Sequence, residues 1–526
     1  MSIASPALAR SSLIRLPRFS PALWYAVAST GLLGLWVGFY IFSPFGFDEA
    51  GRDSWHHAAV LRELMAHPFS PTNPHLPTNE PSRYFTPLAL LAALPGRLFG
   101  LSPYALFGLM GAANCIGLVA ACWLFARRYF PSPWAPLILL LTLLFVWGSQ
   151  MSHAGLHNYA TWLSSAAYPA TIALVLGLFS WALALKALDS TQLRPIWFLL
   201  LGALTAVTLL VHQLSAVFML AGTGCLILFH ERAGLGAKAS MLAAMALGSL
   251  ATLMWPYFPI IEVVSSGSDP RWKSAFTPMN RVSTVLMLAA PTFVGVIGFR
   301  KPQGGWRWEL VLPAAFFSAA YLVLVLQGSA IAHRIPPGVI LYNQLGVVWL
   351  AISYGERLQE DPRLKFALVS TITIIIAGTA LFAGMTRMQD LRRRASEGSL
   401  IGMAEAIART IPPGSVSFAT ERVVFPLQST GRRVVSIPRP EPAAPSLTER
   451  QLATDQFFDG TTSTAERYRL IDRWDAKYVV FVPNELRPEV VRDLRALGPA
   501  KSFSHDAEVV AIDRTRAPAR YAKARK

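Results

Sequence analysis

A cluster of acidic and histidine side chains stands between residues 48 and 57 of the sequence. Asp48 and Glu49 are adjacent. Asp53 and His57 follow at i, i+4 spacing, which puts two side chains on the same face of a helix. His56 precedes His57, and neighbouring residues point about 100° apart on a helix, so at most one of these imidazoles readily faces a common site. A carboxylate in such a cluster can act as a general base.

Other uses of the same residues stay open. Carboxylates beside histidines also permit a divalent metal site, although their spacing matches no known ligand signature, so we assign no metal ligands. Asp48 and Glu49 can equally be a solvated loop end. We take Asp48 as the candidate base and Glu49 as its acidic neighbour.

Further polar residues stand between apolar stretches. His153 and His157 are spaced i, i+4, and His333 and Arg334 are adjacent. Arg334 is the strongest of these, because the planar guanidinium group suits a phosphate. The alternative for each is an interfacial side chain whose polar end reaches water.

The elements that position these residues follow from the composition. The 526 residues are 53% hydrophobic and 15% charged, whereas soluble domains carry about a quarter charged residues. In lipid, backbone polar groups must be satisfied within the segment, so the apolar stretches form helices. We predict an all-α polytopic membrane protein with about eleven transmembrane helices, near 22–42, 104–126, 133–149, 168–187, 196–212, 214–230, 237–257, 282–299, 308–327, 338–355 and 364–384.

Two apolar stretches do not have the length of a single span. The apolar run 196–230 is too long for one span, so we predict two short helices that meet at His212-Gln213. Segment 85–100 is broken by Pro87 and Pro95, which indicates an interfacial or re-entrant helix. The helical segment from Asp48 to His67 carries an apolar stripe, which predicts that it lies on the membrane surface.

Basic residues set the orientation. With a cytoplasmic N-terminus, the inner loops hold 15 Lys and Arg, against 8 in the outer loops, although the outer loops are longer. This bias places the loop 43–103 outside and accounts for the net charge of +17 without a nucleic-acid partner. We expect a multi-pass protein of the inner (cytoplasmic) membrane.

The region after the last span is no longer membrane-like. Alternating helix and strand patterns predict a small α/β extracytoplasmic domain. The expected strands are Ser415–Ala419, Val434–Ile437, Tyr478–Val482 and Val509–Ile512, and the expected helices are Ala404–Ile411, Ala465–Trp474 and Pro488–Leu497. We therefore divide the chain into a transmembrane domain (1–384, including the extracytoplasmic loop 43–103), an extracytoplasmic α/β domain (385–513) and a basic tail (514–526).

Several local motifs occur in an order that resembles the GT-C superfamily of glycosyltransferases. Phe47-Asp48-Glu49 opens a long external loop after the first span. Tyr84-Phe85-Thr86-Pro87-Leu88 is similar to that family's Tyr-x-x-Pro-Leu stretch before an apolar helix. A soluble domain after the last span also matches. The lipid A aminoarabinose transferases in this superfamily usually show Lys-Pro-Pro-Leu, where this chain has Phe85-Thr86-Pro87.

The resemblance implies an inverting transfer of a sugar from a polyprenyl-phosphate donor. It makes Asp48 the catalytic base and Glu49 the second acidic residue of the site. Arg334, with Arg83 or His333, would stabilise the leaving phosphate. The acceptor would be a glycan, a lipid or a protein, and the donor's tail would lie in membrane lipid. The expected substrate-binding residues are Asp53, His56, His57, Arg83, Tyr84, His153, His157, His333 and Arg334.

Two rival functions stay open. A transporter or flippase for lipid-linked glycans would show internal repeats and ionisable residues near mid-membrane, and the sequence has no clear repeat. A non-catalytic envelope assembly protein would leave the acidic and histidine residues of the first loop unexplained. We expect no certain cofactor, with a divalent metal as the open alternative.

Overall fold

The fold is given by a computed structural model. It describes residues 20–42, 52–146, 158–190, 194–265, 292–357 and 399–518, without 440 and 442, together with a few single positions between 377 and 389. Four residues of the expected site therefore lie outside the described residues, namely Asp48, Glu49, His153 and His157. The boundary proposed near residue 385 also lies there.

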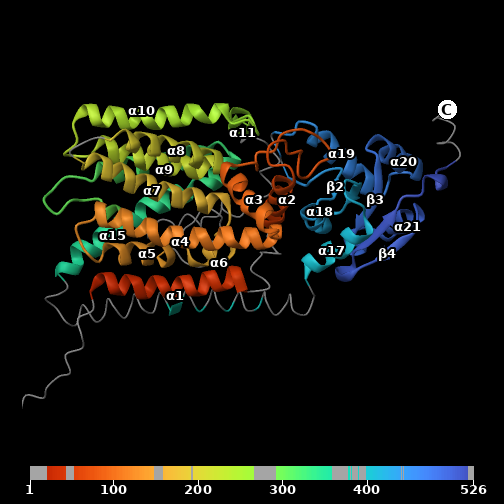
Figure 1. Ribbon diagram of the computed structural model, residues 1–526, viewed down its shortest axis with the longest axis horizontal. Helices are drawn as coiled ribbons and strands as arrows, with labels where there is room; N and C mark the ends of the chain where they lie inside the picture. Colours follow the sequence, from red (N-terminus) through yellow and green to blue (C-terminus); the bar gives the residue numbers. More distant parts are fainter. Residues whose placement is uncertain are drawn as a thin grey trace, which may run out of the picture.

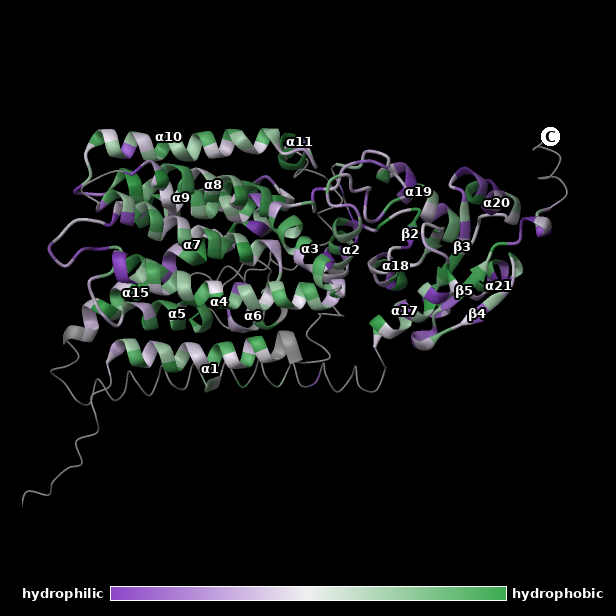
Figure 2. Ribbon diagram, in the orientation of Figure 1, coloured by the Kyte–Doolittle hydropathy of each residue, from purple (hydrophilic) through white to green (hydrophobic). Residues whose placement is uncertain are grey.

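Apolar helices make up the larger part of the molecule and run side by side (Figure 1). Figure 2 shows that hydrophobic residues dominate these helices. A helix satisfies its own backbone polar groups, as a segment surrounded by lipid must. Six helices in the described ranges are long and apolar enough to cross a membrane. Among the described residues, the bundle includes α1 (Pro21–Phe42), α4 (Pro103–Tyr129), α5 (Ala135–Phe145), α6 (Tyr159–Ser165), α7 (Pro169–Leu188), α8 (Pro195–Val211), α9 (Gln213–Leu228), α10 (Leu235–Ala251), α14 (Trp308–Leu326) and α15 (Pro336–Arg357).

The predicted architecture of a polytopic helical membrane protein with a small C-terminal α/β domain is confirmed. The number of about eleven spans stays a prediction, because 282–291 and most of 364–384 lie outside the described residues. The predicted break at His212 is present. Its backbone is extended (φ −158°, ψ 103°), and its Nδ1 accepts a hydrogen bond of 3.2 Å from the Ser215 N–H at the start of α9.

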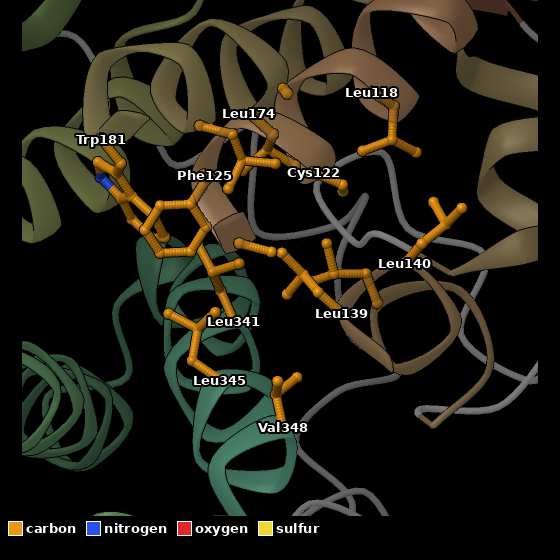
Figure 3. Close-up of a cluster of buried hydrophobic side chains, with 14 of the residues drawn as sticks. Leu118, Cys122, Phe125, Leu139, Leu140, Leu174, Trp181, Leu341, Leu345 and Val348 are labelled. Carbon is orange, nitrogen blue, oxygen red and sulfur yellow. The ribbon is translucent and has the colours of Figure 1, made fainter. Parts of the chain in front are cut away.

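The bundle is held together by buried apolar side chains and by close backbone approach. Phe125 of α4, Leu139 of α5, Trp181 of α7 and Leu345 of α15 meet in one cluster (Figure 3). The indole N–H of Trp181 donates a hydrogen bond of 2.7 Å to the Met219 carbonyl, so this buried donor is satisfied. Small residues let other helices approach more closely, as between α8 and α10.

Two short helices lie between the bundle and the C-terminal domain (Figure 1). They are α2 (Arg52–Ala66) and α3 (Pro87–Phe99). With 13 residues, α3 is about 20 Å long, which is shorter than the hydrocarbon core. Thr86 caps it at the N-terminus, and Gly100 ends it with φ 65°. A short helix rather than a full span agrees with the expectation for segment 85–100.

The prediction that α2 lies on the membrane surface is wrong. Its apolar residues Ala58, Leu61 and Leu64 are 0–1% exposed. They belong to a core cluster that also contains Phe107 of α4 and Phe425 of the C-terminal domain. Periodicity identified the apolar face correctly, but protein covers that face instead of lipid.

The C-terminal domain is built on a five-stranded sheet in the order β2-β1-β3-β5-β4. β1 is parallel to β2 and β3, whereas β5 is antiparallel to β3 and β4. Phe418 and Phe457 stack at 3.9 Å in its core. The strands are β1 (Val416–Ala419), β2 (Arg433–Val434), β3 (Ala476–Phe481), β4 (Ala500–Ser502) and β5 (Glu508–Ala511), and the helices are α17 (Leu400–Thr410), α18 (Glu421–Ser429), α19 (Leu447–Phe458), α20 (Thr464–Arg473) and α21 (Pro488–Ala496).

Candidate active site

A small pocket lies where α2, α3, α4, α7 and α8 meet. Its polar side chains are His57, Tyr84 and Thr86. The rest of its wall is apolar and is formed by Val60, Leu61, Leu88, Ala89, Phe107, Met110, Ala167, Pro169, Ile172 and Val211. An apolar pocket with a few convergent polar groups is the usual form of a small-molecule site.

His57 is the ionisable residue of this pocket. Its ring stacks on Phe107 with centroids 5.6 Å apart and meets the Tyr84 ring edge-on at 5.5 Å. Burial and then the charge of Arg83 lower the pKa of His57 to about 4. The imidazole is therefore neutral at pH 7, and it can both donate and accept a hydrogen bond.

Arg83 lies beside the same tyrosine. Its Nη2 donates a hydrogen bond of 3.2 Å to the Tyr84 hydroxyl, and its guanidinium carbon is 5.1 Å from the Tyr84 ring centroid. Burial acts to lower the pKa of Arg83, but Tyr84 and Glu441 outweigh it and leave the pKa raised. Arg83 is thus a firmly charged group next to the pocket.

Arg334 brings a second positive charge to this region. It ends the 3-10 helix η4 (Ala330–Arg334), which precedes α15. Burial, followed by the charge of Arg83, lowers the pKa of Arg334 to about 10, so the group stays protonated at pH 7. Two guanidinium groups that repel each other in a partly buried place would be stabilised by an anion between them.

The two neighbouring histidines have different surroundings. His56 is 0% exposed and does not line the pocket. Its ring stacks on Tyr84, with centroids 5.5 Å apart and an interplanar angle of 5°, and its Nδ1 is 3.2 Å from His75 Nε2. Only His57 faces the pocket, as the helical spacing predicted. His56 instead supports the position of Tyr84.

Asp53 is held away from the pocket. Its carboxylate forms an ion pair with Arg439 of the C-terminal domain, and the Asp53 side chain is 37% exposed. The side chain of His333 lies outside the described residues, like Asp48, Glu49, His153 and His157. The structure thus brings Arg83, Tyr84 and His57 together, the charge of Arg83 acts on Arg334, and the roles of all these residues stay predictions.

Two residues near the pocket had no signal in the sequence. The Tyr168 hydroxyl is 2.8 Å from Ser54 Oγ, and the Tyr168 ring is 5.8 Å from the His57 ring. Glu441 reaches Arg83 from the C-terminal domain. Its only distinction in the sequence is that it is a charged residue in a proline-rich stretch. In the described part of the chain, no group of three or more His, Cys, Asp or Glu side chains is arranged to hold a metal ion.

Comparison with known proteins gives a result at the level of structure. No family model matches the chain, and no curated protein sequence does. ArnT from Cupriavidus metallidurans, bound to undecaprenyl phosphate, matches with a TM-score of 0.53 and 15% identity, over 94% of this chain and 99% of that one. The mycobacterial arabinofuranosyltransferase AftD matches with a TM-score of 0.57 and 14% identity, over 94% of this chain and 40% of that one.

A third match is the oligosaccharyltransferase AglB from Archaeoglobus fulgidus, in complex with an inhibitory peptide and a dolichol-phosphate. It has a TM-score of 0.51 and 12% identity, over 95% of this chain and 75% of that one. All three proteins are GT-C glycosyltransferases. This chain has the GT-C fold.

The GT-C fold extends over nearly the whole chain, which confirms the resemblance seen in the sequence motifs between residues 47 and 88. Sequence identities of 12–15% speak for the fold alone. Together with the apolar helices, the fold makes this a multi-pass membrane protein. A fold alone does not determine an activity, which depends on the residues in and near the pocket.

Proposed function

We propose that this chain is a membrane glycosyltransferase that transfers a sugar from a polyprenyl-phosphate donor to an acceptor at the extracytoplasmic face. One observation carries the proposal. Arg83 donates a hydrogen bond of 3.2 Å to the hydroxyl of Tyr84, which lines a largely apolar pocket, and the charge of Arg83 also acts on the guanidinium group of Arg334. Such a site suits a ligand with a phosphate and a long hydrocarbon chain.

The two arginines would stabilise the leaving group. Breaking the bond between the anomeric carbon and the phosphate oxygen leaves polyprenyl phosphate with additional negative charge. Fixed guanidinium groups in a site that excludes water stabilise such developing charge strongly. Two of the matched structures contain polyprenyl phosphates, undecaprenyl phosphate and dolichol-phosphate, which supports the same donor class here.

Asp48 would be the general base. Its carboxylate would take the proton of the acceptor hydroxyl, whose oxygen would attack the anomeric carbon from the side opposite the phosphate. The reaction would invert the configuration at that carbon. The neutral imidazole of His57 and the hydroxyl of Tyr84 would hold sugar hydroxyls by hydrogen bonds. Glu49 would be the second acidic residue of the site, next to Asp48 in the sequence.

The proposed topology places this chemistry outside the cytoplasm. With 15 Lys and Arg on the proposed inner side and 8 on the outer side, the charge bias supports a cytoplasmic N-terminus and an extracytoplasmic C-terminal domain. We propose the inner membrane as the location, and the division into domains 1–384 and 385–513 with a basic tail as the organisation of the chain.

The proposal is tested with the purified protein in lipid vesicles. Polyprenyl-phosphate sugars are supplied as donors, and release of polyprenyl phosphate and glycosylation of candidate acceptors are followed by mass spectrometry. Asp48→Asn should remove turnover but retain donor binding. Asp189→Asn is the matched control. The N-terminal end of α7 lines the pocket, whereas Asp189 follows the C-terminal end and pairs there with His230.

Two results would count against the enzyme. Full turnover by Asp48→Asn would exclude that residue as the base. Movement of an intact lipid-linked glycan across the vesicle membrane, without release of polyprenyl phosphate, would instead favour a flippase. Repeating the turnover assay with a chelator tests the divalent-metal alternative, since a required ion would be removed.

A further inference from the structure

A buried carboxylate of the C-terminal domain contacts one of the two arginines of the site. Glu441 is 4% exposed. Its Oε1 accepts a hydrogen bond of 3.3 Å from the backbone N–H of Arg83, and its Oε2 lies 3.9 Å from Arg83 Nε. Residues 358 positions apart in the chain are thereby joined through both the backbone and the charge of Arg83.

The burial of Glu441 is costly unless a partner compensates it. Removing a carboxylate from water costs several kcal/mol, which a nearby cation and hydrogen-bond donors offset. Burial raises the pKa of Glu441, and the charge of Arg83 and the backbone N–H groups of Arg83 and Ala443 offset that rise only in part. Arg83 is therefore the principal cation that stabilises the ionised form of Glu441.

Arg83 belongs to a short turn that depends on such an anchor. The turn contains hydrogen bonds of 3.2 Å from the Phe85 N–H to the Ser82 carbonyl and of 2.8 Å from the Thr86 N–H to the Tyr84 carbonyl. Neither of them fixes the N–H of Arg83, which goes to Glu441. Glu441 therefore contacts both the backbone N–H and the guanidinium group of Arg83.

Other residues of the C-terminal domain contact the same segment of the chain as Glu441. Five residues further on, Ser446 donates hydrogen bonds to Glu80, of 3.1 Å from its N–H and 2.6 Å from its hydroxyl. Arg433 of the same domain donates hydrogen bonds of 2.9 Å to Glu63 and 2.8 Å to Thr72. These contacts dock the domain on segment 52–86 on both sides of residue 441.

We propose that Glu441 is a positioning residue through which the C-terminal domain completes the donor-phosphate site, by holding Arg83 against Tyr84 at the edge of the pocket. This inference rests on the proposed function, since it takes the ligand of the two arginines to be the phosphate of a polyprenyl donor. It assigns the C-terminal domain a part in donor binding. The arginine touches the phosphate, and the glutamate acts only through the arginine.

Variants of Glu441 separate its two contacts. Glu441→Ala removes both, whereas Glu441→Gln keeps the volume and the acceptor for the Arg83 N–H but loses the charge. We expect Glu441→Ala to raise the KM for donor about tenfold with kcat within about twofold, and Glu441→Gln to give an intermediate KM, because a positioning residue changes binding before chemistry. Glu80→Gln is the matched control, since Glu80 also docks the domain but contacts neither arginine.

A double-mutant cycle tests whether Glu441 acts through Arg83. The Kd of polyprenyl phosphate alone is measured for Arg83→Ala, Glu441→Ala and the double variant. If the proposal holds, Glu441→Ala weakens binding in the wild-type background and has no further effect in Arg83→Ala. Equal effects in both backgrounds would overturn it, as would an unchanged Kd in the single variant.

The same measurement distinguishes the inference from the function on which it rests. A wild-type chain that does not bind polyprenyl phosphate overturns the proposed function itself. A wild-type chain that binds it as tightly as a folded Glu441→Ala variant overturns only the role of Glu441. If Glu441→Ala unfolds, the Kd of polyprenyl phosphate for Glu441→Gln is used instead, because the glutamine side chain keeps the shape of glutamate and the hydrogen bond to the Arg83 backbone.

Discussion

The imidazole rings of His56 and His75 meet edge-on, with centroids 4.5 Å apart and His56 Nδ1 3.2 Å from His75 Nε2. Both side chains are 0% exposed. Of the two nitrogen atoms that face each other, one must carry a hydrogen and the other a lone pair, which requires at least one neutral ring. The charges of Arg83 and Arg433 act on this pair as well, and both disfavour protonation. Both imidazole rings of the pair are therefore uncharged at neutral pH.

The first prediction is loss of stability in mild acid. Burial, followed by the charge of Arg433, lowers the pKa of His75 to about 3, and burial lowers that of His56 as well. Because the unfolded histidines titrate near 6.5, the unfolded chain binds more protons below that pH. The stabilisation is complete above about pH 6.5 and is lost as the pH falls toward 3.

Thermal unfolding in detergent between pH 7.5 and 4.5 measures this effect. The melting temperature should fall with pH, and His75→Gln should make the curve flatter. The window between about pH 6.5 and 5 is the informative one, because histidines titrate there and carboxylates titrate mainly at lower pH. A flat curve there would contradict the prediction.

The second prediction concerns the contact between Arg433 and Glu63, whose side chains are 16% and 10% exposed. Arg433→Gln leaves a largely buried carboxylate without its cation and should cost about 3 kcal/mol of unfolding free energy. The control is Arg473→Gln, because Arg473 and Glu449 form an ion pair in which both side chains are more than half exposed. Breaking that pair should cost about 0–1 kcal/mol. Equal losses in the two variants would count against a docking role for Arg433.

The third prediction tests the close approach of α8 and α10. A Cβ atom at Gly248 would lie 2.2 Å from the Gly202 carbonyl oxygen, so Gly248→Ala must push the two helices apart. We expect a lower melting temperature and a lower yield of folded protein. Gly236→Ala on the same helix is the control, since a Cβ there meets nothing within 4 Å. It should be neutral or slightly stabilising.

The fourth prediction concerns the charge and shape of Arg334. Arg334→Gln should weaken binding of polyprenyl phosphate about tenfold or more, because a partly buried cation is removed from the phosphate. Arg334→Lys keeps the charge but not the planar fork, and should recover only part of the affinity. Titration of the lipid into each purified variant gives the dissociation constants. Full affinity in Arg334→Gln would exclude this arginine from the site.

The fifth prediction is the location of the C-terminal domain. A reporter enzyme that is active only outside the cytoplasm should be active when fused after residue 400. The same reporter fused after residue 232, in the short loop between α9 and α10, should be inactive. A cytoplasmic location of the fusion after residue 400 alone would mean that the number of spans between the two fusion sites is wrong by one, and reversal at both sites would mean that the side of the N-terminus or the spans before residue 232 are wrong.

The sequence predicted the helices well where apolar length alone decides them. The pair α8 and α9 was recognised because about 35 apolar residues exceed one bilayer crossing, and His212 marked the break. Local strand and helix patterns likewise predicted β1, β3, β5, α20 and α21. The short strand β4 and the helices α18 and α19 were missed, because β4 has three exposed residues and α19 has no clear apolar face.

Contacts distant in sequence were beyond that reasoning. The apolar face of α2 was visible, but its cover comes in part from Phe425, more than 350 positions away. Arg83 and Arg334 were expected in the site on chemical grounds, whereas Glu441 carries no local signal because its importance lies in its partner. Asp48 and Glu49 stay predictions, since they lie outside the described residues.

The docking of the last part of the chain on segment 52–86 has a consequence for biosynthesis. Glu63 and Arg433 are 370 positions apart. At about 5–20 residues per second, the ribosome needs roughly 20 to 70 s to add the residues between them. During that time the buried faces of α2, with His56 and Glu63, have no C-terminal domain to cover them. Until the C-terminal domain has been synthesised, these faces of α2 stay partly exposed.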